Sequence, residues 1–314
     1  MKRRIYIDGA AGTTGLEIHD RLSRRQDIEL LRISDNERKV LAARARLLNE
    51  ADIAVLCLPD EAAREAVASI ENPDTRVLDA STAHRSASGW AYGFPEIESG
   101  QREVIRHASR VSNPGCYPTG FLALVRPLVR SGLIPPDFPL TVNAVSGYSG
   151  GGRSMIEEFE NESSPRFTGS FFRSYALSLS HKHSPEMQKH AGLAHPPVFA
   201  PSVGRFYRGM IVEVPLQLWS LPRQPSSVVI RDVLAEAYAQ EPLIDVEPFG
   251  EAPATLDAEM LKGSDRMKLF VFGSKHTRQA RLVGVLDNLG KGASGAAVQN
   301  LNIMLGLPET AGLR

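Results

Sequence analysis

The stretch Ile5-Tyr6-Ile7-Asp8-Gly9-Ala10-Ala11-Gly12-Thr13-Thr14-Gly15 decides the fold of the first part of this chain. Its apolar start is typical of a short strand, and Leu16, Ile18 and Leu22 follow the glycines at helical spacing. A strand that enters a helix through glycines can hold a pyrophosphate, because backbone N–H groups and the helix N-terminus face the turn. The stretch therefore predicts the first βα unit of a nucleotide-binding domain.

The three glycines follow the spacing G-x-x-G-x-x-G rather than G-x-G-x-x-G. Glycines also close tight turns that bind nothing, so the spacing alone leaves both interpretations open. The position of the turn, before a second strand predicted over residues 28–33, favours a dinucleotide site. The residues that we expect to bind the cofactor there are Gly9, Gly12, Thr13, Thr14 and Gly15.

The end of the second strand falls about 20 residues beyond the turn, where a dinucleotide domain contacts the ribose. Asp35 would accept a hydrogen bond from the 2′-hydroxyl of NAD and repel a 2′-phosphate. Ser34, Arg38 and Lys39 could instead bind the 2′-phosphate of NADP. A solvated charged loop would need no ligand, so the residues alone leave three alternatives open.

The alternation of strand and helix patterns continues after this loop. Residues 51–58 and 76–79 predict two more strands, with a helix over residues 61–70 between them. This order predicts a parallel, doubly wound sheet, with Cys57 packed in its core. Ligands bind at the carboxyl ends of such strands, so Arg85 in the loop that follows is a candidate for an anion, or else a surface arginine.

The pattern changes beyond residues 133–136. A predicted strand at residues 139–145 ends in a glycine-rich loop that could approach a substrate closely, with Gly150 and Arg153 as candidate binding residues. Long β-rich runs and a helical segment follow, at residues 198–203, 210–218, 228–238, 268–272 and 281–286. We therefore expect an α/β chain: a Rossmann-like, doubly wound nucleotide-binding domain at residues 1–117, then an α+β catalytic domain with a mixed sheet at residues 118–292.

Cys116 stands inside the segment Ser112-Asn113-Pro114-Gly115-Cys116-Tyr117-Pro118-Thr119-Gly120, just ahead of an apolar run at helical spacing. Thr119 suits the N-cap or first turn of that helix. The N-terminus of a helix favours a thiolate by roughly 0.3–1 kcal/mol. Free cysteines are also commonly inert core residues, so a nucleophile would need a histidine from elsewhere in the chain.

The segment Ser180-His181-Lys182-His183-Ser184-Pro185-Glu186-Met187 could supply that histidine. Ser184 as N-cap and Pro185 at the first helical position predict a helix, so His183 would immediately precede its N-terminus. That position disfavours the imidazolium and suits a neutral proton acceptor. A surface histidine is one alternative. A metal site with His190 and His195 is another, but no HExxH or CxxC spacing supports it, and we expect no metal.

Composition limits the partners. The 314 residues carry 36 Lys and Arg against 36 Asp and Glu, which predicts no general attraction to nucleic acid or to an anionic membrane. Two cysteines suit a reducing compartment, and no apolar stretch reaches the roughly 18 residues of a membrane span or forms a signal peptide. We expect a cytoplasmic protein with a small anionic substrate, and the β-rich segments make a homo-oligomer plausible.

Four segments together closely resemble the N-acetyl-γ-glutamyl-phosphate reductase family, and the resemblance spans nearly the whole chain. They are the glycine turn, the cysteine segment, the His181–Glu186 segment and the run Asp287-Asn288-Leu289-Gly290-Lys291-Gly292-Ala293 to Asn302. The chain length, Ser81–Arg85 and Ser146–Gly152 are similar to the shorter of the two forms of that family. The resemblance implies a fold shared with aspartate-semialdehyde dehydrogenase, in which a C-terminal helix, here residues 293–314, completes the nucleotide domain.

The resemblance also implies an activity, the NADPH-dependent reduction of N-acetyl-γ-glutamyl phosphate to the γ-semialdehyde in arginine biosynthesis. Cys116 matches the family's nucleophile, His183 or else His181 would manage the proton, and Asn288 should lie near the nicotinamide. Asp35 departs from the expected preference for NADP. Two alternatives stay open: an enzyme for a longer or carrier-linked acyl phosphate, and a nucleotide-binding regulator that would need no activated thiol.

Overall fold

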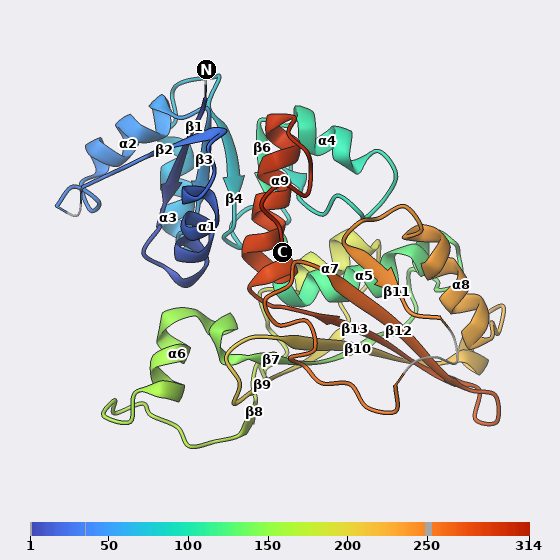
Figure 1. Cartoon of the computed structure of the whole chain (residues 1–314). Coiled ribbons are helices and arrows are strands. Elements are labelled where there is room, and N and C mark those ends of the chain that lie inside the picture. Colours follow the sequence, from blue (N-terminus) through green and yellow to red (C-terminus); the bar gives the residue numbers. More distant parts are fainter. Residues whose placement is uncertain (1, 35, 249–252) are drawn as a thin grey trace. The chain divides into compact units, whose positions relative to one another are not determined.

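The computed structural model describes residues 2–34, 36–248 and 253–314, so Asp35 lies outside the described residues. The chain forms two compact units (Figure 1). Unit 1 comprises Met1–Pro95, Ser99–Gly115 and Ala293–Leu313. Unit 2 comprises Glu96–Glu98, Cys116–Gly292 and Arg314. Each unit is built around its own β-sheet.

Unit 1 contains a six-stranded sheet in the order β2-β1-β3-β4-β6-β5, and all its strand pairs are parallel. The strands are β1 (Arg3–Asp8), β2 (Ile28–Leu31), β3 (Ile53–Leu56), β4 (Arg76–Asp79), β5 (Ala91–Tyr92) and β6 (Arg110–Ser112). The helices are α1 (Thr13–Ser23), α2 (Leu41–Glu50), α3 (Asp60–Ala68), α4 (Gln101–His107) and α9 (Gly295–Leu305).

Helices cover both faces of this sheet, because successive side chains of a strand point to opposite faces. Ile5 of β1 joins a buried cluster with Ile18 of α1 and Leu301 of α9. Tyr6, the next residue of β1, joins a second cluster with side chains of α2 and α3, among them Leu48. The prediction of a doubly wound parallel sheet is therefore confirmed. The C-terminal helix α9, red in Figure 1, lies beside α4 within this unit.

Unit 2 contains a seven-stranded sheet in the order β11-β12-β13-β10-β7-β9-β8. Two of its pairs, β7 with β9 and β11 with β12, are parallel and the others are antiparallel, so the predicted mixed sheet is confirmed. The strands are β7 (Thr141–Gly147), β8 (Phe172–Ser174), β9 (Val198–Gly204), β10 (Met210–Gln217), β11 (Ile244–Val246), β12 (Met267–Ser274) and β13 (Gln279–Leu286). The helices are α5 (Cys116–Arg130), α6 (Gly152–Glu160), α7 (Ser184–Ala191) and α8 (Ser227–Ala237), with short turns at Tyr148–Gly151, Leu218–Ser220 and Gly290–Ser294.

Helix α5 approaches the sheet of unit 2 closely at Gly120. A Cβ added to Gly120 would lie 2.8 Å from Cγ2 of Val212 in β10, so only glycine permits this close approach. The helix also contacts α7 and α8, and most of its side chains are buried. This packing fixes the N-terminal residue of α5, which is Cys116.

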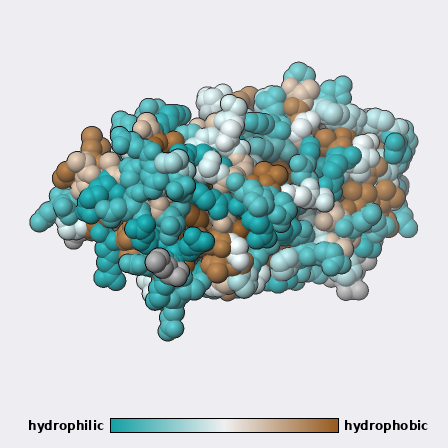
Figure 2. Space-filling view, turned by 90° about the horizontal axis from the view of Figure 1, so that it is seen from above, coloured by the Kyte–Doolittle hydropathy of each residue, from teal (hydrophilic) through white to brown (hydrophobic). Residues whose placement is uncertain are grey.

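Several element boundaries differ from the sequence predictions. Helix α5 begins at Cys116, ahead of Thr119, and His183 rather than Ser184 is the N-cap of α7. Helix α2 was not predicted, because its alanines and arginines give a weak apolar pattern. Along the described residues, no helix has the length and apolar character that crossing a bilayer requires. The face drawn in Figure 2 is mostly hydrophilic, with apolar residues scattered among the hydrophilic ones.

Candidate active site

The glycine turn of unit 1 is shaped by backbone contacts. Gly9 has φ +87°, and a Cβ there would lie 2.3 Å from the carbonyl oxygen of Cys57. A Cβ on Gly15 would lie 2.4 Å from the carbonyl oxygen of Gly9, whereas a Cβ on Gly12 would meet nothing closer than 3.5 Å. Gly9 and Gly15 are therefore needed by the fold, and Gly12 leaves open the space in front of the helix.

The N-terminus of α1 suits an anion, because no side chain caps it. Gly12 is the N-cap residue and forms no side-chain hydrogen bond, and the first turn holds no acidic residue. The first backbone N–H groups and the positive end of the helix dipole then face the turn. Thr13 and Thr14, the first two residues of the helix, are partly buried beside it. This arrangement fits the pyrophosphate of a dinucleotide.

The loop after β2 contains the residues predicted to contact the ribose. Ser34 is exposed, and its hydroxyl donates a hydrogen bond to the Glu37 carboxylate over 2.6 Å. The backbone N–H of Arg38 donates to the carbonyl oxygen of Ser34 over 3.1 Å, and the Arg38 side chain is exposed. Ser34 and Arg38 thus lie in one short turn on the surface of unit 1.

Cys116 is the first residue of α5 and is half-buried beside two tyrosines. The Tyr175 hydroxyl donates to the Tyr117 hydroxyl over 3.0 Å, and Tyr117 donates to the carbonyl oxygen of Ser202 over 3.2 Å. Burial raises the pKa of Tyr175 to about 12 and that of Tyr117 well above its usual value, and the negative charge of a Cys116 thiolate adds to both shifts. Both phenols therefore stay protonated near the thiol.

Two histidines complete this cluster within unit 2. The ring of His183, which is 6% exposed, lies 5.8 Å from that of Tyr117 and 4.7 Å from that of His181. The backbone N–H of His183 donates to Nδ1 of His181 over 3.1 Å. Burial, and then the nearby Lys182, lower the pKa of His181 to about 4. His181 is therefore neutral at neutral pH, with its proton on Nε2.

The turn that follows β13 also reaches this cysteine. A Cβ on Gly292 would lie 2.9 Å from Cβ of Cys116, so the backbone of the turn packs directly against the thiol-bearing residue. Asn288 is 2% exposed; its Oδ1 accepts from the Gly209 N–H over 2.8 Å and its Nδ2 donates to the Ser149 hydroxyl over 2.9 Å. The Asn288 side chain thus links the turn after β13 to the glycine-rich loop Ser146–Gly152.

The candidate substrate residues lie in three different settings. Gly150 is exposed, and a Cβ there would lie 3.4 Å from Nδ2 of Asn288. Arg153 is exposed in the first turn of α6. Arg85, in unit 1, is partly buried, and its guanidinium donates to the carbonyl oxygens of Asn113 and Ala80 over 2.9 and 3.0 Å.

Sequence reasoning did not single out Tyr117, Tyr175 or Ser202. Tyr117 adjoins the cysteine and could have been noticed there, but Tyr175 follows an irregular segment with no periodic pattern. Tyr175 directly follows β8, and the pairing of β8 with β9 sets Ser174 opposite Ser202. Among the described residues, no group of three or more His, Cys, Asp and Glu side chains is arranged to hold a metal ion.

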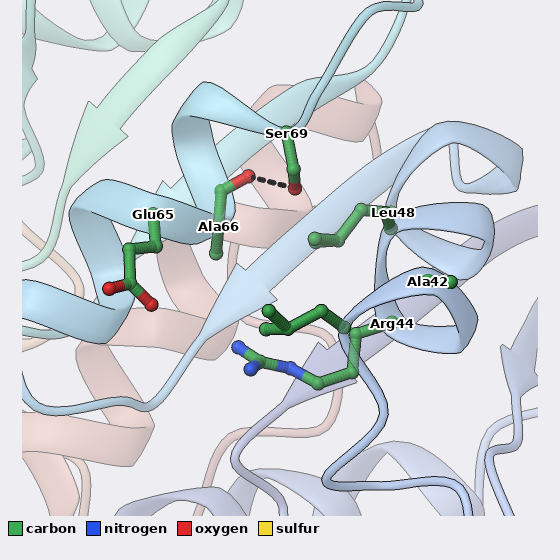
Figure 3. Close-up of a pocket in the computed structure, with 8 residues that line it drawn as sticks. Ala42, Arg44, Leu48, Glu65, Ala66 and Ser69 are labelled. Carbon is green, nitrogen blue, oxygen red and sulfur yellow. Dashed lines mark hydrogen bonds between the residues drawn. The ribbon is translucent and has the colours of Figure 1, made fainter.

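A cavity of about 280 Å³ lies between α2 and α3 of unit 1 (Figure 3). Its lining is Leu41, Ala42, Arg44, Ala45, Leu48, Glu65, Ala66 and Ser69. The lining is mostly apolar, and Arg44 already pairs with the buried carboxylate of Asp8 over 2.8 Å. No residue predicted from the sequence to bind a ligand takes part in it.

Two family models match the chain. Residues 4–108 match the NAD binding domain of semialdehyde dehydrogenases, and residues 116–288 match their dimerisation domain. Aspartate semialdehyde dehydrogenase II from Vibrio cholerae has a TM-score of 0.72 at 16% identity, covering 98% of this chain and 99% of that one. A probable aspartate-semialdehyde dehydrogenase from Pseudomonas aeruginosa has the same score at 17% identity, covering 97% and 99%. The fold and the site thus define the semialdehyde dehydrogenase class.

Curated relatives narrow this class. The chain is 53% identical over 320 residues to "N-acetyl-gamma-glutamyl-phosphate reductase 2" from Nostoc sp., covering 99% of both chains. It is also 53% identical over 309 residues to the reductase of that name from Brucella anthropi, covering 98% and 99%. The chain belongs to the N-acetyl-γ-glutamyl-phosphate reductases within the semialdehyde dehydrogenase family. The resemblance seen in its sequence motifs is confirmed.

Proposed function

We propose that this chain reduces N-acetyl-γ-glutamyl phosphate to N-acetylglutamate 5-semialdehyde and phosphate, a step of arginine biosynthesis, with NADPH as reductant. The observation that carries the proposal is the placement of Cys116 at the N-terminus of α5, next to Tyr117, whose ring contacts the rings of His181 and His183. The 53% identity to reductases of this name over nearly the whole chain supports the choice of substrate.

The proposed chemistry begins with the thiol. The Cys116 thiolate attacks the acyl carbon, the carbon–oxygen bond to phosphate breaks, and a thioester on Cys116 results. We propose that the first N–H groups of α5, which a helix leaves without an intrahelical partner, stabilise the negative charge that develops on the reacting carbonyl oxygen. A dinucleotide, when bound, supplies the hydride that reduces the thioester carbon. Collapse of the thiohemiacetal then releases the aldehyde and restores the thiolate.

We assign the proton transfers to His183, with His181 as its support. The Nδ1 atom of His181 already accepts the backbone N–H of His183, so His181 orients the N-cap of α7 and is unsuited to use that nitrogen for substrate. The low pKa of His181, about 4, makes it a poor proton donor near neutral pH. His183→Asn should therefore lower kcat more than His181→Asn.

We propose NADP rather than NAD as the cofactor. The family model establishes a dinucleotide-binding domain, and the uncapped α1 with its glycine turn fits the pyrophosphate. Ser34, Arg38 and Lys39 lie in the loop where a 2′-phosphate would be contacted. Arg38→Ala should raise the KM for NADPH about tenfold and leave that for NADH within about twofold. Equal effects on both cofactors would contradict this assignment.

For the anionic substrate we propose contacts from Arg85, Arg153 and the backbone of Gly150. Arg153 is exposed beside the glycine-rich loop, and Arg85 lies in the loop after β4. Arg153→Lys keeps the charge but loses the fork that binds an anion through two hydrogen bonds. Comparing the KM for the acyl phosphate in Arg153→Lys and Arg153→Ala would separate charge from geometry.

We also assign dinucleotide binding to residues 1–117 with 293–314, apart from Cys116, which begins a segment of unit 2, and catalysis to Cys116 and residues 118–292. The description of the second family model as a dimerisation domain supports a homo-oligomer. Light scattering coupled to gel filtration would measure the mass of the assembly against the 34.3 kDa of one chain. A single-chain mass at micromolar concentration would reject the oligomer.

The decisive experiment runs the reaction backwards. Given N-acetylglutamate 5-semialdehyde, NADP⁺ and phosphate, the enzyme should make NADPH steadily, because phosphate attacks the thioester on Cys116. Without phosphate, a burst of about one NADPH per active site should appear, followed by slow hydrolysis. Arsenate should replace phosphate, and aspartate semialdehyde serves as the control substrate. Steady turnover without either anion would refute the proposed function.

A further inference from the structure

A buried ion pair joins two distant parts of the sequence within unit 2. Nζ of Lys291 lies 2.6 Å from Oε1 of Glu96, and the two side chains are 1% and 0% exposed. Burying two charges costs hydration that their attraction only partly returns, so such a pair is a poor source of stability. The role of this ion pair depends on the backbone segment that it holds in place.

Lys291 is the second residue of the π-helical turn Gly290–Ser294, which follows β13. Both neighbouring residues are glycines in close backbone contact. A Cβ on Gly290 would lie 2.1 Å from the carbonyl oxygen of Ser264, and one on Gly292 would lie 2.9 Å from Cβ of Cys116. Turns of this kind occur often at functional sites. The backbone at Gly292 is thus the surface against which the cysteine packs.

The start of this turn is anchored by a buried carboxylate. Asp287 is 0% exposed and accepts hydrogen bonds from the N–H groups of Leu289 over 2.9 Å and of Gly263 over 2.5 Å. Its carbonyl oxygen accepts from the Gly292 N–H over 2.9 Å. Between these anchors, the Lys291 side chain ties the turn to the separate segment Glu96–Glu98.

We propose that Glu96 and Lys291 are positioning residues for Cys116. Their ion pair holds the Gly292 backbone against the cysteine and so fixes the direction from which its sulfur attacks. The proposal rests on the acyl-transfer role proposed above for Cys116. A misplacement of about 1 Å in a reacting group can cost roughly 100-fold in rate, so a small shift of this turn suffices for a large effect.

The experiment compares Lys291→Met, Glu96→Gln and the double variant Glu96→Leu/Lys291→Met. In each, Tm, kcat, the KM for the acyl phosphate and the rate of Cys116 labelling by iodoacetamide are measured, the last by mass spectrometry of its peptide. The single variants should lower kcat and the labelling rate about 10- to 100-fold, with KM changed less than about threefold. The double variant leaves no unpaired buried charge, so it should regain Tm while kcat stays at least about tenfold low.

Lys268→Met is the matched control. Lys268 of β12 pairs with Glu247, which follows β11, over the same 2.6 Å, and both side chains are partly exposed. The control variant should keep the parental kcat and labelling rate. If Lys291→Met does not fold, Glu96→Asp replaces it in the experiment. Because its side chain is one methylene shorter, this variant should have a kcat that is several-fold lower and the same Tm as the parent.

Two results would overturn the proposal. One is a parental kcat and labelling rate in Lys291→Met or, where that variant does not fold, in Glu96→Asp. The other is a double variant that regains kcat together with Tm. The proposed function is tested separately, because labelling of Cys116 needs no turnover. If the parent enzyme fails to reduce the acyl phosphate while the labelling rate still depends on Lys291, the proposed function is rejected and the positioning role of the pair is retained.

Discussion

The two cysteines of this chain occupy opposite environments. Cys57 follows β3 and is partly buried against the core of unit 1, where burial, and then Asp79 and Asp8, raise the pKa of its thiol to about 12. Cys116 begins α5 in unit 2, near Tyr117 and Tyr175, and the ring of Tyr117 contacts those of His181 and His183. Cys57 lies in an apolar run, whereas Cys116 follows Asn113-Pro114-Gly115 ahead of a helix, so the sequence neighbours already differ.

The difference teaches that reactivity depends on what surrounds the sulfur. Cys57 contributes its backbone: its N–H donates to the carbonyl oxygen of Asp8 over 2.8 Å, and its own carbonyl oxygen lines the glycine turn at Gly9. Cys116 contributes its side chain, which a helix N-terminus favours as the thiolate. Cys57 thus has a structural role, and Cys116 is the cysteine that we propose for the chemistry.

The strongest test of this contrast is to remove each sulfur in turn. Cys116→Ser should lower kcat on the order of 10³-fold or more, because a hydroxyl is hardly ionised at neutral pH, while NADPH binding stays within about twofold. Cys57→Ala should keep kcat within about threefold. Coupled absorbance assays and cofactor titration measure both. A serine variant with near-parental turnover would remove Cys116 from the mechanism.

The structural role of the Cys57 region is tested at the glycine turn that it contacts. Gly9→Ala should destabilise the chain by about 3 kcal/mol or more, because the residue has positive φ and its Cβ would collide with the Cys57 carbonyl oxygen. Gly12→Ala, whose Cβ meets only ordinary contacts, should cost less than about 1 kcal/mol and chiefly weaken NADPH binding. Urea unfolding and cofactor titration distinguish them. Equal stabilities for the two variants would contradict the contact argument.

Chemical labelling compares the two thiols in the native protein. At pH 8 a thiol with a pKa of about 12 is ionised in roughly one molecule in 10,000, so Cys57 should react slowly with iodoacetamide. We expect Cys116 to be labelled at least about 100-fold faster. Mass spectrometry of the two peptides gives the rates, and in 8 M urea they should become similar. Equal rates in the native protein would show that the environments do not differ as described.

The smallest expected effect concerns His181, whose ring contacts that of Tyr117, the residue after Cys116. The pKa of His181, about 4 in the folded chain, lies below its usual 6.5, so between these pH values the unfolded chain binds one more proton. This linkage should remove at most about 2 kcal/mol of stability on going from pH 7.5 to pH 5. In urea unfolding, His181→Asn should therefore lose up to about 2 kcal/mol less stability than the parent on going from pH 7.5 to pH 5. If the stabilities of parent and variant showed the same pH dependence, the imidazole of His181 would be solvated rather than buried.

Short-range patterns explain which parts of the fold could be predicted. The glycine turn, β4 at Arg76–Asp79 and the run of β10 are local features, since apolar periodicity and glycine chemistry act over a few residues. The start of α7 was predicted one residue late, with Ser184 rather than His183 as N-cap. Helix ends depend on hydrogen bonds that sequence periodicity does not contain.

The site shows the same division. The sequence alone indicated Cys116 and the two histidines, because each lies in a short motif beside a predicted helix N-terminus. It gave no role to Tyr175, which follows β8 and donates a hydrogen bond to Tyr117, 58 residues away in the chain. Arg85 was expected to meet an anion, yet its guanidinium also binds two backbone carbonyls, a use that no sequence motif indicates.

By itself, then, the sequence determined the class of fold and the family and indicated the residues that we propose for the site, since these depend on local patterns and on motifs that stay together along the chain. The tertiary structure alone decided which distant groups meet. Lys291 and Glu96 are 195 residues apart, and nothing near either one predicts that they form a buried pair. Such contacts form when packing closes long loops of chain. The free energy that offsets this closure comes from the whole core rather than from any one segment.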